Sequence, residues 1–174
     1  MPVITDHDHE AIWASLAELA DPEIPVISLS ELGILREVRT GPDGMPEVVI
    51  TPTYSGCPAM GQIEDDVRAA LAHAGISARV VTQLAPAWTT DWMSEAAREK
   101  LRAYGIAPPQ CGSSDNEDTH VLKFSRQPVQ RAAVPCPQCG SNHTTETSPF
   151  GSTACKSMYR CLDCLEPFDY FKPY

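Results

Sequence analysis

One cysteine in this sequence stands where a thiol could do chemistry. Cys57 lies in the stretch TPTYSGCP, residues 51–58, between Gly56 and Pro58. Proline favours the first turn of an α-helix, so we expect the sulfur to lie near the positive end of a helix dipole, which would lower the pKa of the thiol. Cysteine is also among the most buried residue types, and the residues alone leave a reactive thiol and a core residue equally open.

Four further cysteines form two Cys-x2-Cys pairs separated by 21 residues: Cys136, Cys139, Cys161 and Cys164. Each such turn can direct two sulfurs at one ion, and two turns complete a tetrahedral thiolate site. Four thiolates leave no open coordination position, so we predict a structural zinc ion, with a rubredoxin-like iron site or an iron–sulfur cluster as the alternatives. A module of some forty residues usually needs a metal or a disulfide to fold, which favours the same interpretation.

Three other residues could take part in metal or thiol chemistry. Cys155 precedes Cys161 by six residues, and we interpret it as a buried or bystander cysteine, with replacement of a zinc ligand or a second thiol near the zinc site as the alternatives. We interpret His143 as a loop residue rather than a ligand, because four cysteines already complete the site. Cys111 is expected to be an exposed spectator.

Two acidic segments are weighed between a functional and a purely structural role. Asp21 and Glu23 bracket a proline in DPEIPV, where carboxylates are usually turn and cap residues. The run DHDHE at residues 6–10 resembles a metal-binding tract, but a solvated helix start explains it equally well.

Acidic residues dominate the chain and limit its partners. The sequence has 13 Lys and Arg against 23 Asp and Glu, a formal net charge of −10, and residues 1–110 hold 7 of the basic and 16 of the acidic side chains. An acidic surface repels phosphate backbones, so we do not expect nucleic acid as a partner.

The cysteine count and the apolar pattern indicate the compartment. Seven cysteines, an odd number, do not suit a closed disulfide framework and indicate metal or thiol chemistry in a reducing environment. The start MPVITDHDHE lacks the basic and apolar regions of a secretory signal, and no apolar run approaches the ~20 residues of a membrane span. We therefore expect a cytoplasmic protein without a membrane segment.

The elements that must position these residues follow from the hydrophobic pattern. Helical periodicity predicts a helix over residues 8–20 and another from residue 57 onward, and β-branched, partly alternating residues predict a hairpin over 33–40 and 47–54 and a strand within 76–84. We expect a third helix, capped by Thr90 or Asp91 and ended by Gly105, whose apolar stripe comprises Met93, Ala97, Leu101 and Tyr104. The order α-β-β-α-β-α predicts an α+β protein, a small two-layer α/β sandwich followed by a C-terminal zinc ribbon.

Changes in composition divide the chain into three parts. We assign residues 1–106 to the α/β domain, 107–133 to a linker rich in Pro, Gly, Ser and acidic residues, and 134–174 to the ribbon. Residues 121–134 could contribute one further strand as the chain approaches the ribbon. The ribbon carries a charge balance of −1 and ends in aromatic residues expected to complete a small core or to dock on a protein: Phe168, Tyr170, Phe171 and Tyr174.

Two motifs resemble those of a known family. DPEIPVISLSELGIL at 21–35 and TPTYSGCP at 51–58 resemble the metal–sulfur cluster assembly family, which includes SufT and the eukaryotic cytosolic iron–sulfur targeting factor. The resemblance implies an α/β fold and a functional cysteine at Cys57, with four further signature positions in iron or cluster transfer: Asp21, Glu23, Thr53 and Gly56.

The remaining segments resemble the PaaD family of accessory proteins of the phenylacetyl-CoA epoxidase. They are residues 86–109, CPQCGS, FGSTACKSMYRC and EPFDYFK. That epoxidase contains a di-iron oxygenase and an iron–sulfur flavin reductase, so the resemblance implies help in maturing their metal centres. Cys57 would transiently hold iron or a cluster, and the ribbon would dock on the oxygenase or the reductase. The oligomeric state is left open, with a homodimer as one alternative.

Two other classes of function remain as alternatives. A non-catalytic structural subunit of the oxygenase complex would use the ribbon for docking and would not need the Cys57 thiol. A thiol-dependent hydrolase or redox enzyme would need a base, a resolving cysteine or a phosphate-binding loop, and the sequence offers none near Cys57. We rank that class last and expect no catalysis by this chain alone.

Overall fold

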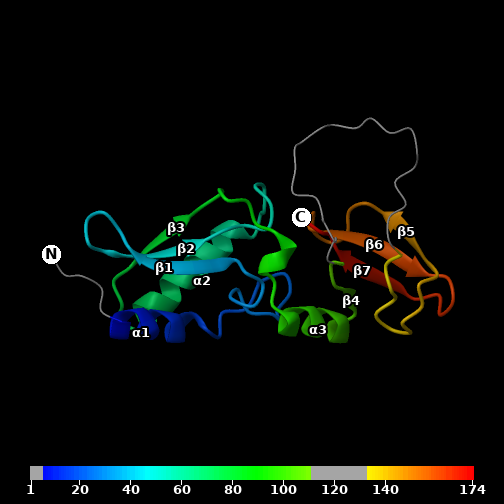
Figure 1. Ribbon diagram of the computed structural model, residues 1–174, viewed down its shortest axis with the longest axis horizontal. Helices are drawn as coiled ribbons and strands as arrows, with labels where there is room; N and C mark the ends of the chain where they lie inside the picture. Colours follow the sequence, from blue (N-terminus) through cyan, green and yellow to red (C-terminus); the bar gives the residue numbers. More distant parts are fainter. Residues whose placement is uncertain (1–5, 111–132) are drawn as a thin grey trace.

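The structure is a computed structural model and describes residues 6–110 and 133–174 (Figure 1), with side chains from residue 9 onward. We call residues 6–105 the front lobe and residues 133–174 the ribbon. Cys111, most of the expected linker and nearly all of the strand considered within residues 121–134 lie outside the described residues.

A three-stranded sheet forms the centre of the front lobe. β1 (Leu35–Thr40) pairs antiparallel with β2 (Pro46–Ile50), and β2 pairs parallel with β3 (Arg79–Thr82). The predicted hairpin and third strand are therefore confirmed. Parallel pairing requires a crossover, and α2 (Met60–His73) supplies it between β2 and β3.

Two helices complete the layer packed on this sheet (Figure 1). α1 (Asp6–Leu16) contacts both α2 and β1. Their apolar residues recur at helical spacing and share one buried cluster with the sheet, to which they contribute Ile12, Leu16, Ile63, Val67 and Leu71. The predicted α-β-β-α-β-α order is confirmed, although α1 ends at Leu16 rather than near residue 20.

The third helix begins later than the sequence suggested. α3 (Glu95–Tyr104) is capped by Ser94, whose hydroxyl accepts a hydrogen bond from the Ala97 amide at 3.1 Å. Thr90 and Asp91, the predicted caps, lie instead in the 3₁₀ turn η1 (Thr90–Trp92). There the Thr90 carbonyl accepts a hydrogen bond from the buried Arg98 guanidinium at 2.7 Å.

The C-terminal end of α3 agrees with the sequence-based prediction, and its apolar stripe agrees in part. The chain leaves the helix through Gly105 at φ 92°, the left-handed conformation that glycine adopts without strain, as predicted. Met93, Ala97 and Leu101 of the predicted stripe are buried, but Tyr104 is 54% exposed and does not belong to the core.

A second sheet joins the front lobe to the ribbon. β4 (Ile106–Ala107) follows α3 and pairs parallel with β7 (Pro167–Phe171), which lies beside β6 (Lys156–Cys161) and then β5 (Thr144–Ser148). The strand order is β4-β7-β6-β5. The chain that leaves the front lobe therefore forms one edge of the ribbon sheet.

The aromatic residues near the end of the sequence complete two cores. Phe168 and Tyr170 are buried in the ribbon core with Tyr159, whereas Phe171 belongs to the front core and its ring lies 6.0 Å from that of Trp88. Strand residues alternate between two faces, so one strand can contribute to both cores. Across residues 6–110 and 133–174, no helix combines the length and apolar character needed to cross a membrane.

Phe171→Ala should reduce the free energy of unfolding by about 3–5 kcal/mol, because it empties an aromatic site in the front core. Urea denaturation followed by circular dichroism measures the change. Phe150→Ala is the matched control: Phe150 is 63% exposed, and its loss should cost no more than about 1 kcal/mol. Equal losses in the two variants would contradict the assignment of Phe171 to that core.

Candidate functional site

A loop between β2 and α2 presents Cys57. The Cys57 amide donates to the Tyr54 carbonyl at 3.2 Å, and the Met60 amide donates to the Cys57 carbonyl at 3.3 Å. These bonds form turns ahead of α2, which begins at Met60, so Cys57 precedes the helix rather than occupying its first turn. The side chain is half-buried.

Burial raises the pKa of the Cys57 thiol, so the predicted lowering of this pKa is wrong. Loss of hydration is the largest cause, and the negative charges of Glu23, Cys155 and Asp21 act in the same direction. A hydrogen bond from the Ala59 amide opposes them. The dipole of a helix that begins three residues later does not outweigh a partly dry site lined by acids.

Asp21 and Glu23 lie beside this thiol. One Asp21 carboxylate oxygen accepts hydrogen bonds from the amides of Glu23 at 2.9 Å and Ile24 at 2.8 Å, so Asp21 is the turn residue that the sequence predicted. Burial raises the pKa of both carboxyls, and the charge of Asp21 raises that of Glu23 further. Ionisation of these two carboxyls, which places negative charge next to Cys57, is therefore energetically unfavourable.

Thr53 and Gly56, the other two predicted site residues, lie in the same loop as Cys57. Thr53 is buried, whereas Gly56 is exposed. A side chain added at Gly56 would meet only the Tyr54 ring, at 3.7 Å, which is ordinary contact. The structure thus brings Asp21, Glu23 and Cys57 together, with Thr53 at the inner and Gly56 at the outer side of the loop.

The ribbon contributes residues to this site that sequence reasoning did not place there. Cys155 is buried in the front core and lies apart from the four-cysteine group. The Thr153 hydroxyl lies 2.9 Å from the Cys155 sulfur, and the Thr153 side chain lowers the pKa of Glu23 by favouring its charged form. The only sequence signal was that Cys155 exceeded the four cysteines needed for a metal.

Lys156 supplies the positive charge of the site. It is 4% exposed, and its ammonium lies 3.7 Å from the Asp169 carboxylate. Its charge also interacts with those of Asp21, Glu23 and Cys155. A buried ammonium needs such partners, because removing a charge from water is costly unless it is paired.

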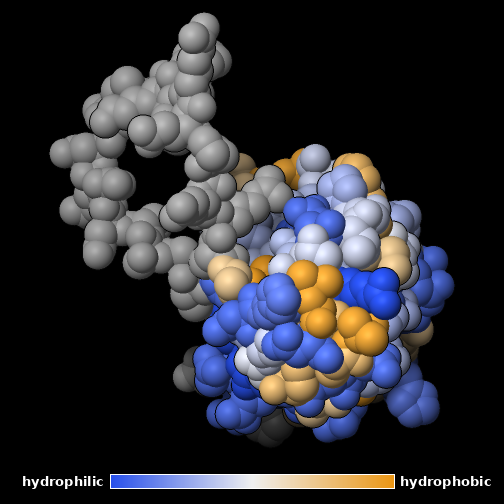
Figure 2. Space-filling view, turned by 90° about the vertical axis from the view of Figure 1, so that its right-hand side faces the viewer, coloured by the Kyte–Doolittle hydropathy of each residue, from blue (hydrophilic) through white to orange (hydrophobic). Residues whose placement is uncertain are grey.

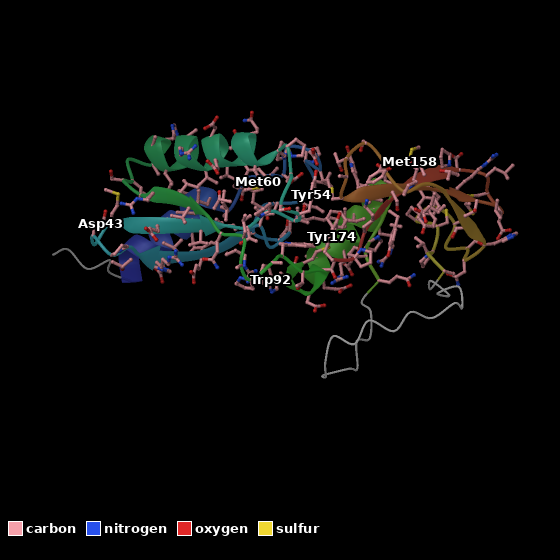
Figure 3. The ribbon with its side chains drawn as sticks, turned by 90° about the horizontal axis from the view of Figure 1, so that it is seen from above. Asp43, Tyr54, Met60, Trp92, Met158 and Tyr174 are labelled. Carbon is pink, nitrogen blue, oxygen red and sulfur yellow. The ribbon has the colours of Figure 1, made fainter. Side chains whose placement is uncertain are left out.

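Aromatic rings surround the two thiols at the junction of the lobes. The rings of Tyr54 and Tyr174 are stacked, with centroids 6.5 Å apart, and Figure 3 shows them next to each other between the front lobe and the ribbon. Burial, then the charges of Cys57 and Cys155, raises the pKa of Tyr54 to about 12. The Thr90 amide donates to the Tyr174 carbonyl at 3.2 Å, which fixes the stacked pair to the front lobe.

The four predicted metal ligands form a separate group. The sulfurs of Cys136, Cys139, Cys161 and Cys164 lie within 4.8 Å of one another. Two pairs are 3.7 and 3.6 Å apart, too far for a disulfide bond of about 2.05 Å and close to the ~3.8 Å expected between thiolates bound tetrahedrally at ~2.3 Å from zinc. This arrangement fits one tetrahedral metal ion.

Hydrogen bonds hold the two Cys-x2-Cys turns in place. The Cys164 amide donates to the Cys161 sulfur at 3.5 Å, and this bond is the main cause that lowers the pKa of Cys161 to about 6. His143 lies outside the four-sulfur group, as predicted, and its Nδ1 is 3.0 Å from an Asp163 carboxylate oxygen. That contact links the loop that follows the Cys136–Cys139 turn to the Cys161–Cys164 turn.

The two sulfur sites offer different chemistry. The four-cysteine group is closed, because four thiolates satisfy a tetrahedral ion. The Cys57 site offers a half-buried thiol and two carboxylates, which are ligands for a metal cation, and a buried ammonium offsets part of their negative charge.

Two family models match the chain in the regions that contain these sites. Residues 9–82 match a family described as "Iron-sulfur cluster assembly protein", and residues 123–172 match one described as "PaaD zinc beta ribbon domain". The first region contains the Cys57 loop, and the second contains the four cysteines and Cys155. The resemblances noted in the sequence are confirmed.

Two curated proteins and one solved structure are also similar to the chain, the first protein over nearly its whole length and the others over about half of it. The chain is 49% identical, over 94% of its length and 92% of the other's, to an Escherichia coli K12 protein named as one subunit of a "Putative 1,2-phenylacetyl-CoA epoxidase". It is 36% identical to an Fe-S protein maturation auxiliary factor of Porphyromonas gingivalis over 53% of this chain and 89% of the other. A crystal structure of a domain of unknown function from Bacillus anthracis, DUF59, matches with TM-score 0.50 and 26% identity over 55% of this chain and 92% of that one.

Glu23→Gln should lower the pKa of the Cys57 thiol, because it removes a nearby negative charge that disfavours the thiolate. The rate of iodoacetamide alkylation at Cys57, followed by mass spectrometry of its peptide across pH, should rise at a lower pH than in the wild type. Glu99→Gln, which neutralises an exposed carboxylate on α3, should leave the curve in place. A Glu23→Gln curve that is unmoved, or moved to higher pH, would contradict the electrostatic account.

Proposed function

The chain belongs to the PaaD family of phenylacetyl-CoA epoxidase proteins, and from this premise we propose that it is a cytoplasmic accessory protein that helps to assemble iron or iron–sulfur centres in an epoxidase complex. The observation that carries this proposal is the half-buried thiol of Cys57 beside Asp21 and Glu23, within the region that matches cluster-assembly proteins. A thiol enclosed by aliphatic side chains could not receive a cargo.

The raised pKa of Cys57 suits transient binding. In the empty site the thiol keeps its proton, so it is a weak nucleophile and is protected from adventitious oxidation. An arriving cation favours the thiolate and releases the proton, because metal binding and thiol ionisation are coupled. Loss of the cargo reverses both steps, which is the behaviour required of a carrier.

We propose that the cargo is delivered rather than chemically transformed. Among the described residues, the charges that raise the pKa of Cys57 belong to carboxylates and another thiol, and none of them is the imidazole base of a thiol hydrolase. Ring oxidation would then belong to the oxygenase and reductase, the partners that the resemblance to the PaaD family implies.

The four-cysteine group is assigned a structural zinc ion on the fit of its sulfur spacing. We retain the division into a cluster-assembly domain at 1–106, a linker at 107–133 and a zinc ribbon at 134–174. Zinc bound by Cys136, Cys139, Cys161 and Cys164 would hold the two turns of the ribbon together and would supply no catalytic step.

The exposed face of the ribbon is the proposed docking surface for a client protein of the complex. Figure 2, which looks at the ribbon end, shows apolar surface gathered among polar side chains. The exposed apolar residues of the ribbon include Phe150, Met158, Leu162 and Leu165. The same surface favours a second candidate function, a structural subunit that docks without carrying metal.

Cys57→Ser should reduce the iron content and the activity of a co-expressed epoxidase complex severalfold, because a hydroxyl is a much poorer ligand for iron than a thiolate. Metal analysis of the purified oxygenase and reductase, with turnover of phenylacetyl-CoA, gives the measurement. Ser55→Ala is the matched control: it removes an exposed hydroxyl from the same loop and should have no effect.

The result also separates the two candidate functions. A structural subunit predicts that Cys57→Ser leaves iron content and activity unchanged while the chain still co-purifies with the complex. That outcome would refute the carrier role and leave the docking role in place.

The purified chain should contain about one zinc ion that Cys139→Ser removes and Cys57→Ser retains, because only the former belongs to the tetrahedral group. Inductively coupled plasma mass spectrometry measures the metal. Chelation should also change the fluorescence of the chain, since Trp88 packs against Phe171 of the ribbon. Iron in place of zinc, or equal zinc loss in both variants, would contradict the assignment.

A further inference from the structure

Cys155 is held in place at the front lobe by the backbone of the ribbon. Its carbonyl accepts a hydrogen bond from the Lys172 amide at 2.9 Å, and the Gly151 amide donates to the Lys156 carbonyl at 2.8 Å. A side chain at Gly151 would come within 2.9 Å of an Asp169 oxygen, so the turn packs closely against β7. The ribbon thus fixes a buried thiol that lies outside its own metal group.

Cys155 and Cys57 share the same polar neighbours. Tyr54, in the Cys57 loop, stacks on Tyr174, and the Tyr174 hydroxyl donates to the Ala154 carbonyl at 3.4 Å, directly before Cys155. The charges of both thiols also act on Asp21, on Glu23 and on each other. The Thr153 hydroxyl lies 2.9 Å from the Cys155 sulfur and also lowers the pKa of Glu23, so it lies close to both the ribbon thiol and the carboxylate beside Cys57. The two lobes therefore bring two thiols and two carboxylates to one place.

We infer that Cys155 is the second sulfur ligand of the Cys57 site, and that the two thiols, with Glu23, bind a single thiophilic divalent cation such as Fe²⁺. This inference rests on the proposed carrier function and names its cargo. Binding would follow a balanced exchange in which the cation replaces two thiol protons, two metal–sulfur bonds form, and both protons leave to solvent.

The number of sulfurs favours an ion over an assembled cluster. Cluster ligation typically uses four cysteines, and this site offers two. Two soft thiolates with a hard carboxylate suit Fe²⁺, which accepts both kinds of ligand. Across the described chain, the four ribbon cysteines are the only group of at least three ligating residues within 4.8 Å of one another, so Cys57, Cys155 and Glu23 would have to move closer together to bind one ion.

Lys156 explains how the empty site stays stable. Its buried ammonium interacts with both carboxylates and with Cys155, and thus supplies part of the charge that a metal would supply. When a divalent cation arrives, the thiolates add two negative charges, and the ion balances them. The ammonium therefore acts as a resident counter-ion, and the cation is needed only while the thiols are ionised.

Cobalt titration tests the inference, because Co²⁺ takes the same ligands as Fe²⁺ and its thiolate bonds absorb in the near ultraviolet. The full chain would carry Cys111→Ser and be loaded with zinc at the ribbon, so that Cys57 and Cys155 are the two thiols left outside the four-cysteine group. This parent should develop a thiolate-to-cobalt band. Cys155→Ser and Cys57→Ser should each lose about half of that absorption and bind at least about tenfold more weakly.

The outcomes separate this inference from the proposed function. A Cys155→Ser variant that binds cobalt like the parent, while Cys57→Ser does not, overturns the role of Cys155 and leaves Cys57 as the carrier residue. The carrier role itself is judged by the iron content of the epoxidase complex. If Cys155→Ser does not fold, cobalt-edge X-ray absorption of the parent decides: two sulfur ligands support the inference, and one overturns it.

Discussion

The packing of the β7 end against the front lobe is the contact on which the rest of this structure depends. Phe171 enters the front core beside Trp88, and β4 pairs with β7 directly after α3. Protein interiors are close-packed, so a ring inserted in this way fixes the orientation of the strand that carries it. The position of Cys155 relative to Cys57 is therefore set by a hydrophobic contact rather than by the thiols. Charge reinforces the junction, because the ribbon buries Lys156 near the Asp21 and Glu23 carboxylates of the front lobe.

Local patterns explain what could be predicted from sequence. The hairpin and α2 follow from alternation and helical spacing, and the four-cysteine group follows from two short turns whose geometry is contained in a few residues. The resemblance to known motifs singled out Asp21, Glu23 and Cys57, and the structure places them together. In each case the information lies within a segment or in a motif that can be read along the chain.

Long-range packing explains what could not be predicted. The pKa of Cys57 depends on burial and on charges from distant segments, so its direction could not be deduced from a neighbouring proline. No sequence pattern indicates that Cys155 and Lys156 face another lobe. Ser94 caps α3 although Thr90 and Asp91 also have suitable side chains, and these two residues instead form the 3₁₀ turn whose Thr90 carbonyl accepts from the buried Arg98.

The long separation in sequence between the Cys57 loop and the ribbon residues around it has a consequence for biosynthesis. Domains generally fold as the chain leaves the ribosome, N-terminal parts first. The front lobe can form its sheet and helices before residues 153–171 have been translated, and during that interval its acidic thiol loop has neither Lys156 nor Cys155. With the ligands proposed above, a nascent chain would lack the second sulfur, so metal binding would have to wait until the ribbon has folded back onto the lobe.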